Sequence, residues 1–155
     1  MLQAFEVTHL HEGDTYLVVT LTFDERKKSR HRTNTDCRQD IGWFIERGIV
    51  LNEGDVLKCE DGTLIKVLAA NELVSDVSTE DGLLLMRAAY HLGNRHVPLQ
   101  VEKEFLRYQK DHVLDEMVIG LGLCVEHVEK PFQPENGAYA GGHSHGHSHG
   151  HSHDH

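Results

Sequence analysis

The chain has 155 residues, of which 39% are hydrophobic, and this is enough apolar material for one domain or two small ones. Its 15 Lys and Arg against 25 Asp and Glu give a formal net charge of −10, which repels a phosphate backbone, so nucleic acid is not an expected partner. No apolar run approaches the roughly 18 residues of a membrane span, and the N-terminal residues lack the pattern of a signal peptide, so we expect no membrane and a cytoplasmic location.

Strands dominate the first half of the sequence. Residues 15–23 are β-branched and apolar, and residues 40–48 end at a glycine that suits a turn. Residues 56–70 predict two strands joined at Asp61-Gly62, a dipeptide that favours a hairpin. Short strands separated by glycine turns are typical of a small barrel or sandwich. We therefore predict an N-terminal all-β domain over residues 1–71.

Two other features of the sequence have plain explanations. The short basic cluster at residues 25–32 is interpreted as a solvated loop or an edge strand, because Lys and Arg discourage pairing at sheet edges. The cysteines Cys37, Cys59 and Cys124 are far apart and form no C-x-x-C motif. Neither a disulfide framework nor a thiolate zinc site is therefore expected.

The pattern changes after residue 71. A strand is expected over residues 72–78, and a helix follows it over residues 78–93. Ser78 or Thr79 can cap this helix, and acidic residues in its first turn suit the positive end of the helix dipole. Gly93 is a natural place for the helix to end.

Four more elements complete this half of the sequence. They are strands at residues 96–102 and 104–109, an amphipathic helix at residues 111–122 and a final strand at residues 123–130. The apolar face of that helix is predicted to hold Val113, Leu114, Met117, Val118 and Leu121. The order β-α-β-β-α-β is that of a ferredoxin-like domain, which we place over residues 72–130. The predicted fold class is α+β with two domains.

A linker with Pro and Gly is expected over residues 131–142, followed by a histidine-rich tail over residues 143–155. Seven histidines alternate there with Ser, Gly or Asp: His143, His145, His147, His149, His151, His153 and His155. In an extended segment, side chains at i, i+2 and i+4 share one face, so several imidazoles can reach one ion. Imidazole suits nickel, zinc and copper. Gly, Ser and His cannot form a packed core, so we expect a disordered tail when no metal is bound.

A purification tag is an alternative explanation of the tail. A tag is normally an uninterrupted run of histidines, whereas Gly and Ser alternate with His in this chain. Metal storage, sensing and delivery share this composition. The tail therefore predicts metal binding and leaves its purpose open.

Other histidines lie in the body of the chain. His91 and His96 flank the end of the first predicted helix, and loops at element ends commonly carry function. His112 lies in the first turn of the next helix, where the helix dipole favours a neutral imidazole that can bind a metal. Each of the three is also explained as a solvated or hydrogen-bonded side chain. His9 and His11 form an H-x-H that a surface strand or turn explains.

Several segments together resemble one known family. The segment AYHLGNRHVPLQ at residues 89–100 is similar to the UreE family of urease accessory proteins. Family-like segments elsewhere are TDCRQDIGWFIERG, LNEGDVL, EDGTLIKVLAA, DHVLDEM and PFQPENGAYA, followed by the histidine-rich terminus. The resemblance covers essentially the whole chain. The combination of G-N-R-H, D-H-V-L-D and G-A-Y is specific, although each motif is weak alone.

The resemblance implies a nickel metallochaperone and not an enzyme. It implies an N-terminal domain similar to peptide-binding chaperone modules, and a homodimer formed by the ferredoxin-like domain. In the family, the His of G-N-R-H from each chain meets its counterpart at the dimer interface and binds one metal ion, which points to His96. Tail histidines between His143 and His155 can complete the coordination. A GTPase accessory protein and the urease apoprotein are the implied partners.

The sequence departs from the family pattern at one place. Some relatives carry H-x-H where this chain has Lys110-Asp111-His112. A protonated lysine amine cannot replace a metal ligand at neutral pH. A secondary site there must therefore be weaker or use His112 alone. His91 also varies in residue type among relatives, so it is the weaker candidate.

The expected function is capture of Ni²⁺ and its delivery for urease assembly, and Zn²⁺ or Cu²⁺ can bind the same nitrogens. A nickel or zinc storage or detoxification protein without a delivery partner is the main alternative. A folding catalyst of the prolyl-isomerase kind would need an aromatic-lined pocket, which 6% aromatic residues and the single Trp43 support poorly. A metal-dependent hydrolase is disfavoured because the sequence has no H-E-x-x-H motif.

Overall fold

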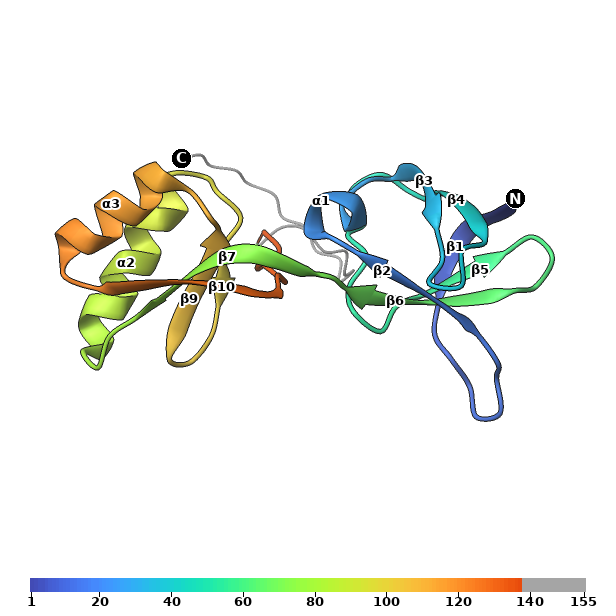
Figure 1. Cartoon of the computed structure of the whole chain (residues 1–155), viewed down its shortest axis with the longest axis horizontal. Helices are drawn as coiled ribbons and strands as arrows, with labels where there is room; N and C mark the ends of the chain where they lie inside the picture. Colours follow the sequence, from blue (N-terminus) through green and yellow to red (C-terminus); the bar gives the residue numbers. More distant parts are fainter. Residues whose placement is uncertain (138–155) are drawn as a thin grey trace, which may run out of the picture.

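The computed structural model describes residues 1–137 and has two lobes arranged along its long axis (Figure 1). The N-terminal lobe, residues 1–70, is built on a six-stranded sheet. The C-terminal lobe, residues 71–137, has a four-stranded sheet and two longer helices. No helix among the described residues is long and apolar enough to cross a membrane.

Six strands and one short helix form the N-terminal lobe. They are β1 (Leu2–Thr8), β2 (Leu17–Leu21), α1 (Phe23–Arg26), β3 (Arg30–Asn34), β4 (Asp40–Phe44), β5 (Val56–Cys59) and β6 (Leu64–Ala69). The strand order is β2-β6-β5-β1-β4-β3, which leaves β2 and β3 at the edges. The hairpin predicted at Asp61-Gly62 is confirmed, since β5 and β6 pair antiparallel and Gly62 has a φ of 91°. Side chains that alternate inward along these strands form the core of the lobe.

The prediction of an all-β first half is wrong at α1. The side chain of Thr22 accepts a hydrogen bond from the Glu25 N–H, and the Glu25 carboxylate accepts one from the Thr22 N–H. This capping box starts a helix at Phe23, so β2 ends at Leu21 instead of continuing to residue 23. Of the basic cluster at residues 25–32, the last part belongs to β3, and the edge-strand interpretation is confirmed there.

The C-terminal lobe follows the expected order of elements. They are β7 (Asn71–Ser78), α2 (Gly82–Asn94), β8 (Gln100–Val101), β9 (Phe105–Gln109), α3 (His112–Leu121) and β10 (Cys124–Pro131). The sheet is antiparallel throughout, with the order β10-β7-β9-β8. Its apolar core joins β7 and β9 to both helices and includes Val77, Ala88, Leu92, Leu106, Tyr108, Leu114 and Val118.

Two boundaries and one exposed side chain in this lobe differ from the prediction. α2 is capped by Asp81, whose carboxylate accepts from the N–H groups of Leu83 and Leu84, because Ser78 still pairs within the sheet. β8 covers only two residues of the predicted strand at 96–102. On the predicted apolar face of α3, Val113 is exposed, whereas the other four side chains are buried or partly buried.

A tight joint connects the two lobes. A single residue, Ala70, separates β6 from β7. Phe132, just beyond β10, packs edge-on against Phe23 of α1, with ring centroids 5.4 Å apart. Arg26 is fully buried and donates hydrogen bonds to the backbone carbonyls of Leu21, Leu51 and Phe132. Burial lowers the pKa of this guanidinium, although nearby carboxylates partly offset the effect. The joint therefore ties the end of β10 to the N-terminal lobe.

Candidate metal centre

His96 directly follows Arg95, the C-cap of α2, in an unusual backbone conformation. Its φ is 59°, and only one other non-glycine residue within residues 1–137 has a positive φ. The His96 N–H donates to the Gly93 carbonyl at 3.0 Å. A left-handed residue at this place is normally Gly or Asn. The prediction that Gly93 ends the helix is wrong, since Gly93 lies inside the last turn and His96 takes the terminating position.

The left-handed backbone at His96 is a sign of function. A residue with a β-carbon pays about 1–2 kcal/mol to adopt this region, although His tolerates it better than most residues. Such outliers persist where the surrounding structure imposes them, and they cluster at functional sites. Here α2 fixes one side of His96, while Val97 and Leu99 pack into the lobe core on the other. The exposed imidazole is therefore held on a well-anchored turn.

His96 lines an open cleft between the two lobes, with a volume of about 910 Å³. The N-terminal lobe contributes Phe23 and residues 46–52, except Leu51, to its walls, and the other walls come from residues 96–98 and 134–137. The last of these segments is held in place because the Glu135 N–H donates to the Leu99 carbonyl at 2.8 Å. Gly137, the last described residue, therefore lies in the same cleft that His96 lines.

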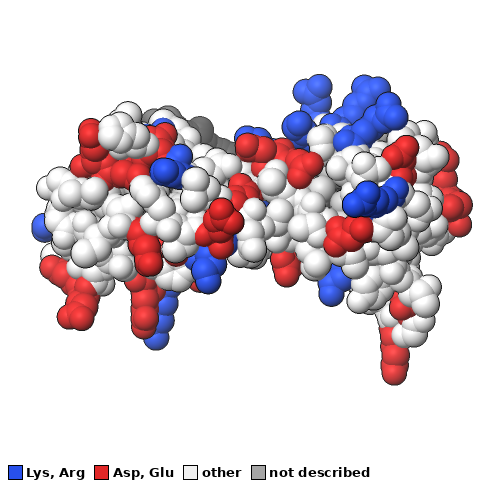
Figure 2. Space-filling view, viewed as in Figure 1, with Lys and Arg blue, Asp and Glu red and all other residues white. Residues whose placement is uncertain are grey.

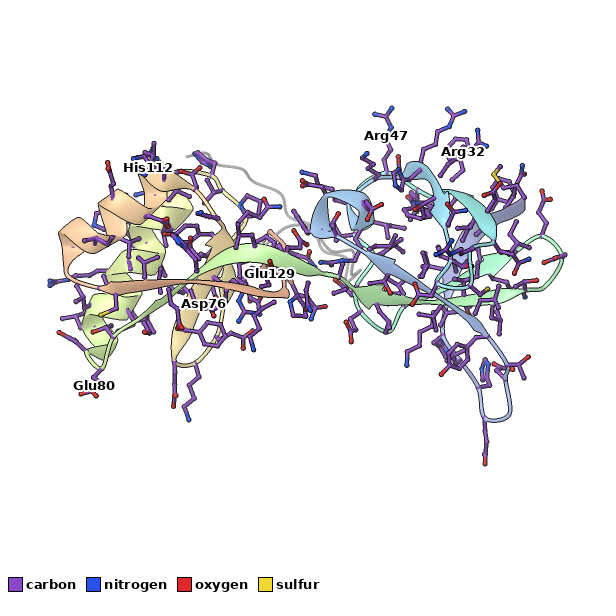
Figure 3. All side chains as sticks on the ribbon, in the orientation of Figure 1. Arg32, Arg47, Asp76, Glu80, His112 and Glu129 are labelled. Carbon is purple, nitrogen blue, oxygen red and sulfur yellow. The ribbon has the colours of Figure 1, made fainter. Side chains whose placement is uncertain are left out.

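The other two candidate ligands in the body lie apart from His96. His112 lies in the first turn of α3, as predicted, and is its first residue, with Nε2 3.1 Å from a carboxylate oxygen of Glu116. Figure 3 shows its side chain at the outer surface of the C-terminal lobe. His91 is exposed in the last turn of α2, and its ring stacks edge-on against Tyr90 at 5.3 Å.

No three His, Cys, Asp or Glu side chains within residues 1–137 are grouped to hold a metal ion. α2 ends and α3 begins at the same end of the lobe (Figure 1), yet the structure does not bring His91, His96 and His112 into one site. The seven tail histidines predicted as ligands, His143 to His155, lie outside the described residues. A site at His96 therefore needs ligands from outside the described part of one chain.

Sequence analysis missed an apolar stripe on α2. Leu83, Met86 and Tyr90 are each more than half exposed and follow the spacing i, i+3, i+7 of one helix face. The opposite face of α2 packs in the core through Ala88 and Leu92. The signal was visible in the sequence, because a helix with apolar residues on two faces has one face left to bury.

A buried carboxylate braces the C-terminal lobe, and sequence analysis missed it too. One oxygen of Asp115 accepts from the Ser75 hydroxyl at 2.8 Å and the Tyr108 hydroxyl at 2.6 Å, and the other oxygen lies 2.7 Å from Nε2 of His127. Burial alone would raise the pKa of Asp115, but these hydrogen bonds outweigh it and hold the pKa below its usual value. Burial and the adjacent carboxylate raise the pKa of Tyr108. The cluster fixes α3 to three strands.

Charge on the surface favours a cation as ligand. Acidic side chains are spread over the C-terminal lobe, whereas Lys and Arg gather mainly over one side of the N-terminal lobe (Figure 2). With a net charge of −10, the chain attracts divalent cations at long range. Imidazoles, not these solvated carboxylates, are the donors that select nickel, zinc or copper.

Comparison with known proteins gives one consistent result. A family model described as "UreE urease accessory protein, N-terminal domain" matches residues 6–70, and one described as "UreE urease accessory protein, C-terminal domain" matches residues 72–155.

Relatives named "Urease accessory protein UreE" are similar over most of the chain. The protein from Teredinibacter turnerae is 61% identical over 127 residues, which cover 81% of this chain and 82% of the relative. That from Saccharophagus degradans is 57% identical over 144 residues, covering 91% and 86%. That from Vibrio parahaemolyticus is 55% identical over 130 residues, covering 84% and 82%.

Proposed function

The chain belongs to the UreE family of urease accessory proteins, and from this we propose that it is a nickel-binding metallochaperone that captures Ni²⁺ and delivers it for assembly of the urease active site. The family consists of accessory proteins and not of enzymes. The observation that carries the proposal is the position of His96. It is exposed on an anchored, left-handed turn, in the cleft from which the chain leaves towards seven histidines.

We place the metal site between two copies of the chain. A transition-metal ion takes about four or more ligands, and among the described residues of one chain His96 is the only imidazole that lines this cleft. A two-fold axis near the end of α2 would bring a second His96 to the same ion. The apolar stripe of Leu83, Met86 and Tyr90 runs along the same helix and supports this arrangement, because a second copy would bury it.

Charge placed in the stripe should separate the two copies. We expect Met86→Asp to weaken dimerisation at least about 100-fold, since a carboxylate would be buried in the apolar interface without a partner. Met86 is exposed within one chain, so the fold should be unaffected. Lys103→Glu, a charge reversal at an exposed position between β8 and β9, is the control and should stay dimeric. Sedimentation velocity checks both, and a Met86→Asp protein that sediments as the unmodified dimer would place the interface elsewhere.

The tail is proposed to add capacity and to reach coordination positions that the two His96 imidazoles leave open. Residue 137 lies in the His96 cleft, and six residues span at most about 20 Å, so His143 begins within reach of the ion. His145, His147, His149, His151, His153 and His155 follow at two-residue intervals. We assign His112, beside Glu116, to a weaker secondary site and give His91 the lowest rank among the candidates.

Delivery of the nickel ion is possible because such a site leaves coordination positions unfilled. Two imidazoles from two chains leave coordination positions that an incoming ligand can occupy before the first ligands depart. The proposed recipients are a GTPase accessory protein and the urease apoprotein, in the cytoplasm. The proposed divisions of the chain are an N-terminal β domain (residues 1–71), a second domain (residues 72–130), a linker (residues 131–142) and the histidine-rich tail (residues 143–155). A ferredoxin-like assignment of the second is supported by the strand order β10-β7-β9-β8.

A chain stopped after Gly142 tests the proposal. We expect calorimetric titration to show that it keeps one tight Ni²⁺ per dimer and loses only the additional, weaker equivalents of the intact chain. The body site depends on His96, and the tail adds ligands of the same chemistry. If truncation instead removes all nickel binding, and a deletion strain keeps normal urease activity, the protein stores nickel and does not deliver it.

A further inference from the structure

A shallow hollow lies on the N-terminal sheet and shares no lining residue with the His96 cleft. It has a volume of about 230 Å³ and lies over the neighbouring strands β1, β4 and β3. The pairing register of β3 and β4 explains the hollow. Gly42 of β4 lies opposite Arg32 of β3, and a β-carbon at Gly42 would approach Arg32 Cγ to 3.4 Å and Met1 Cε to 3.6 Å. The missing side chain of Gly42 therefore leaves the space between its neighbours.

The lining combines apolar surface with positive charge. Met1, Phe5 and Phe44 line the hollow, and each is at least half exposed. Arg30 lies opposite Phe44 in the sheet, and its guanidinium stands over the Phe44 ring at 5.2 Å from the centroid. This stacking orients the guanidinium and leaves its N–H groups free to bind a carboxylate.

Positive charge at this place is concentrated and uncompensated. Figure 2 shows Lys and Arg gathered on one side of the N-terminal lobe, and Figure 3 shows Arg32 and Arg47 projecting from that side. In residues 1–137, neither Arg30 nor Arg32 forms an ion pair, whereas the nearby Lys27 pairs with an aspartate. Protection of the β3 edge explains the arginines but not the exposed apolar side chains beside them.

We propose that this hollow binds an acidic segment of a protein partner, with one apolar side chain of the segment in the hollow and the flanking carboxylates on Arg30 and Arg32. The volume is below the roughly 300–1,000 Å³ of small-molecule pockets and suits a single large side chain. A nucleic-acid backbone would meet the same arginines, but its phosphates carry no apolar side chain to fill the hollow.

The test uses the full-length, metal-free chain and a fluorescein-labelled peptide, EDEFDED. Fluorescence anisotropy is recorded in EDTA at a pH of about 8, where the tail imidazoles are neutral and do not attract the peptide. We expect Arg30→Glu and Arg32→Glu each to weaken binding at least about tenfold. Lys103→Glu, the same charge reversal on the C-terminal lobe, should change it less than about twofold. The peptide EDEADED, without the aromatic side chain, should bind at least about fivefold more weakly.

Two results would overturn the proposal. In the first, Arg30→Glu, Arg32→Glu and Lys103→Glu all bind the peptide as the unmodified chain does. In the second, EDEADED binds as tightly as EDEFDED. The hollow would then bind no apolar side chain, and the arginines would be explained by protection of the β3 edge alone. Emission of the single Trp43, whose indole N–H donates to the Lys28 carbonyl at 2.9 Å, reports whether the sheet stays intact. Nickel binding, measured by titration, should be unchanged in all three variants. A failure of the acidic-segment proposal can therefore be distinguished from a failure of the proposed nickel site.

Discussion

Replacing His96 with alanine should remove the tight nickel site while leaving the fold intact. In the proposed dimer, one substitution deletes two imidazole ligands from the same ion, so we expect the affinity for the first Ni²⁺ to fall at least about 100-fold. The side chain is exposed and makes no hydrogen bond with other described residues that its loss would break. Calorimetry should be done on the chain stopped after Gly142, because tail histidines would mask the loss.

Two control variants separate this site from general histidine chemistry. His91→Ala and His112→Ala each remove one exposed imidazole from the same lobe and should leave the tight site within about threefold of its original affinity. Equal effects of all three substitutions would show that His96 has no special role. Unchanged affinity in His96→Ala would show that the body site lies elsewhere.

Glycine at the same position should have opposite effects on stability and binding. At a φ of 59°, His96→Gly relieves a left-handed residue of its β-carbon and should raise the free energy of unfolding by up to about 1 kcal/mol, while still abolishing the tight nickel site. Urea unfolding measures the first effect and calorimetry the second. A stability gain with a binding loss would show that histidine is present there for its imidazole.

Removing the buried carboxylate of Asp115 should destabilise the protein severely. Asp115→Ala leaves the hydroxyls of Ser75 and Tyr108 without their acceptor in the core and opens a cavity beside them, so we expect a loss of about 3–5 kcal/mol in the free energy of unfolding. Urea denaturation followed by circular dichroism measures it. Asp115→Asn keeps one oxygen as an acceptor for both hydroxyls and should lose roughly half as much or less.

The same pair of proteins tests the pKa of Asp115. Because the folded-state pKa is lowered, ionised Asp115 contributes stability that is fully present above the ordinary aspartate pKa of about 3.9 and is lost as pH falls through the lower folded value. The difference in unfolding free energy between the unmodified chain and Asp115→Asn should therefore shrink as the pH falls from about 5 to below about 4. A difference that grows over this range would contradict the direction of the shift.

Local signals predicted much of the fold. The Asp61-Gly62 hairpin and the helix predicted over residues 111–122 agree with the structure, where α3 covers His112–Leu121, because each depends on neighbouring residues, a tight turn in one case and the Asp111 cap in the other. β1 was not predicted, since its place between β4 and β5 depends on residues far away in the chain. The cap of α2 was misplaced because sheet pairing keeps Ser78 in β7.

The candidate site was only partly readable from the sequence. The G-N-R-H motif pointed to His96, but its left-handed backbone and its place in the cleft come from how α2 ends and how the segment before residue 137 docks. The capping box at Thr22 and Glu25 is a local pattern that sequence analysis overlooked. The Asp115 cluster joins side chains from four separate elements, and no periodicity or spacing signals such an arrangement.

The joint at Arg26 and Phe132 makes the two lobes poor interchangeable modules. A cut at Ala70 looks natural, yet it would strip Phe132 of its packing against Phe23 and would leave Arg26 buried beside two carbonyls instead of three. The isolated C-terminal fragment would then carry an exposed aromatic residue just before the segment that lines the His96 cleft. Chimeras that exchange lobes between relatives should therefore transfer residues 131–133 together with the N-terminal lobe that receives them.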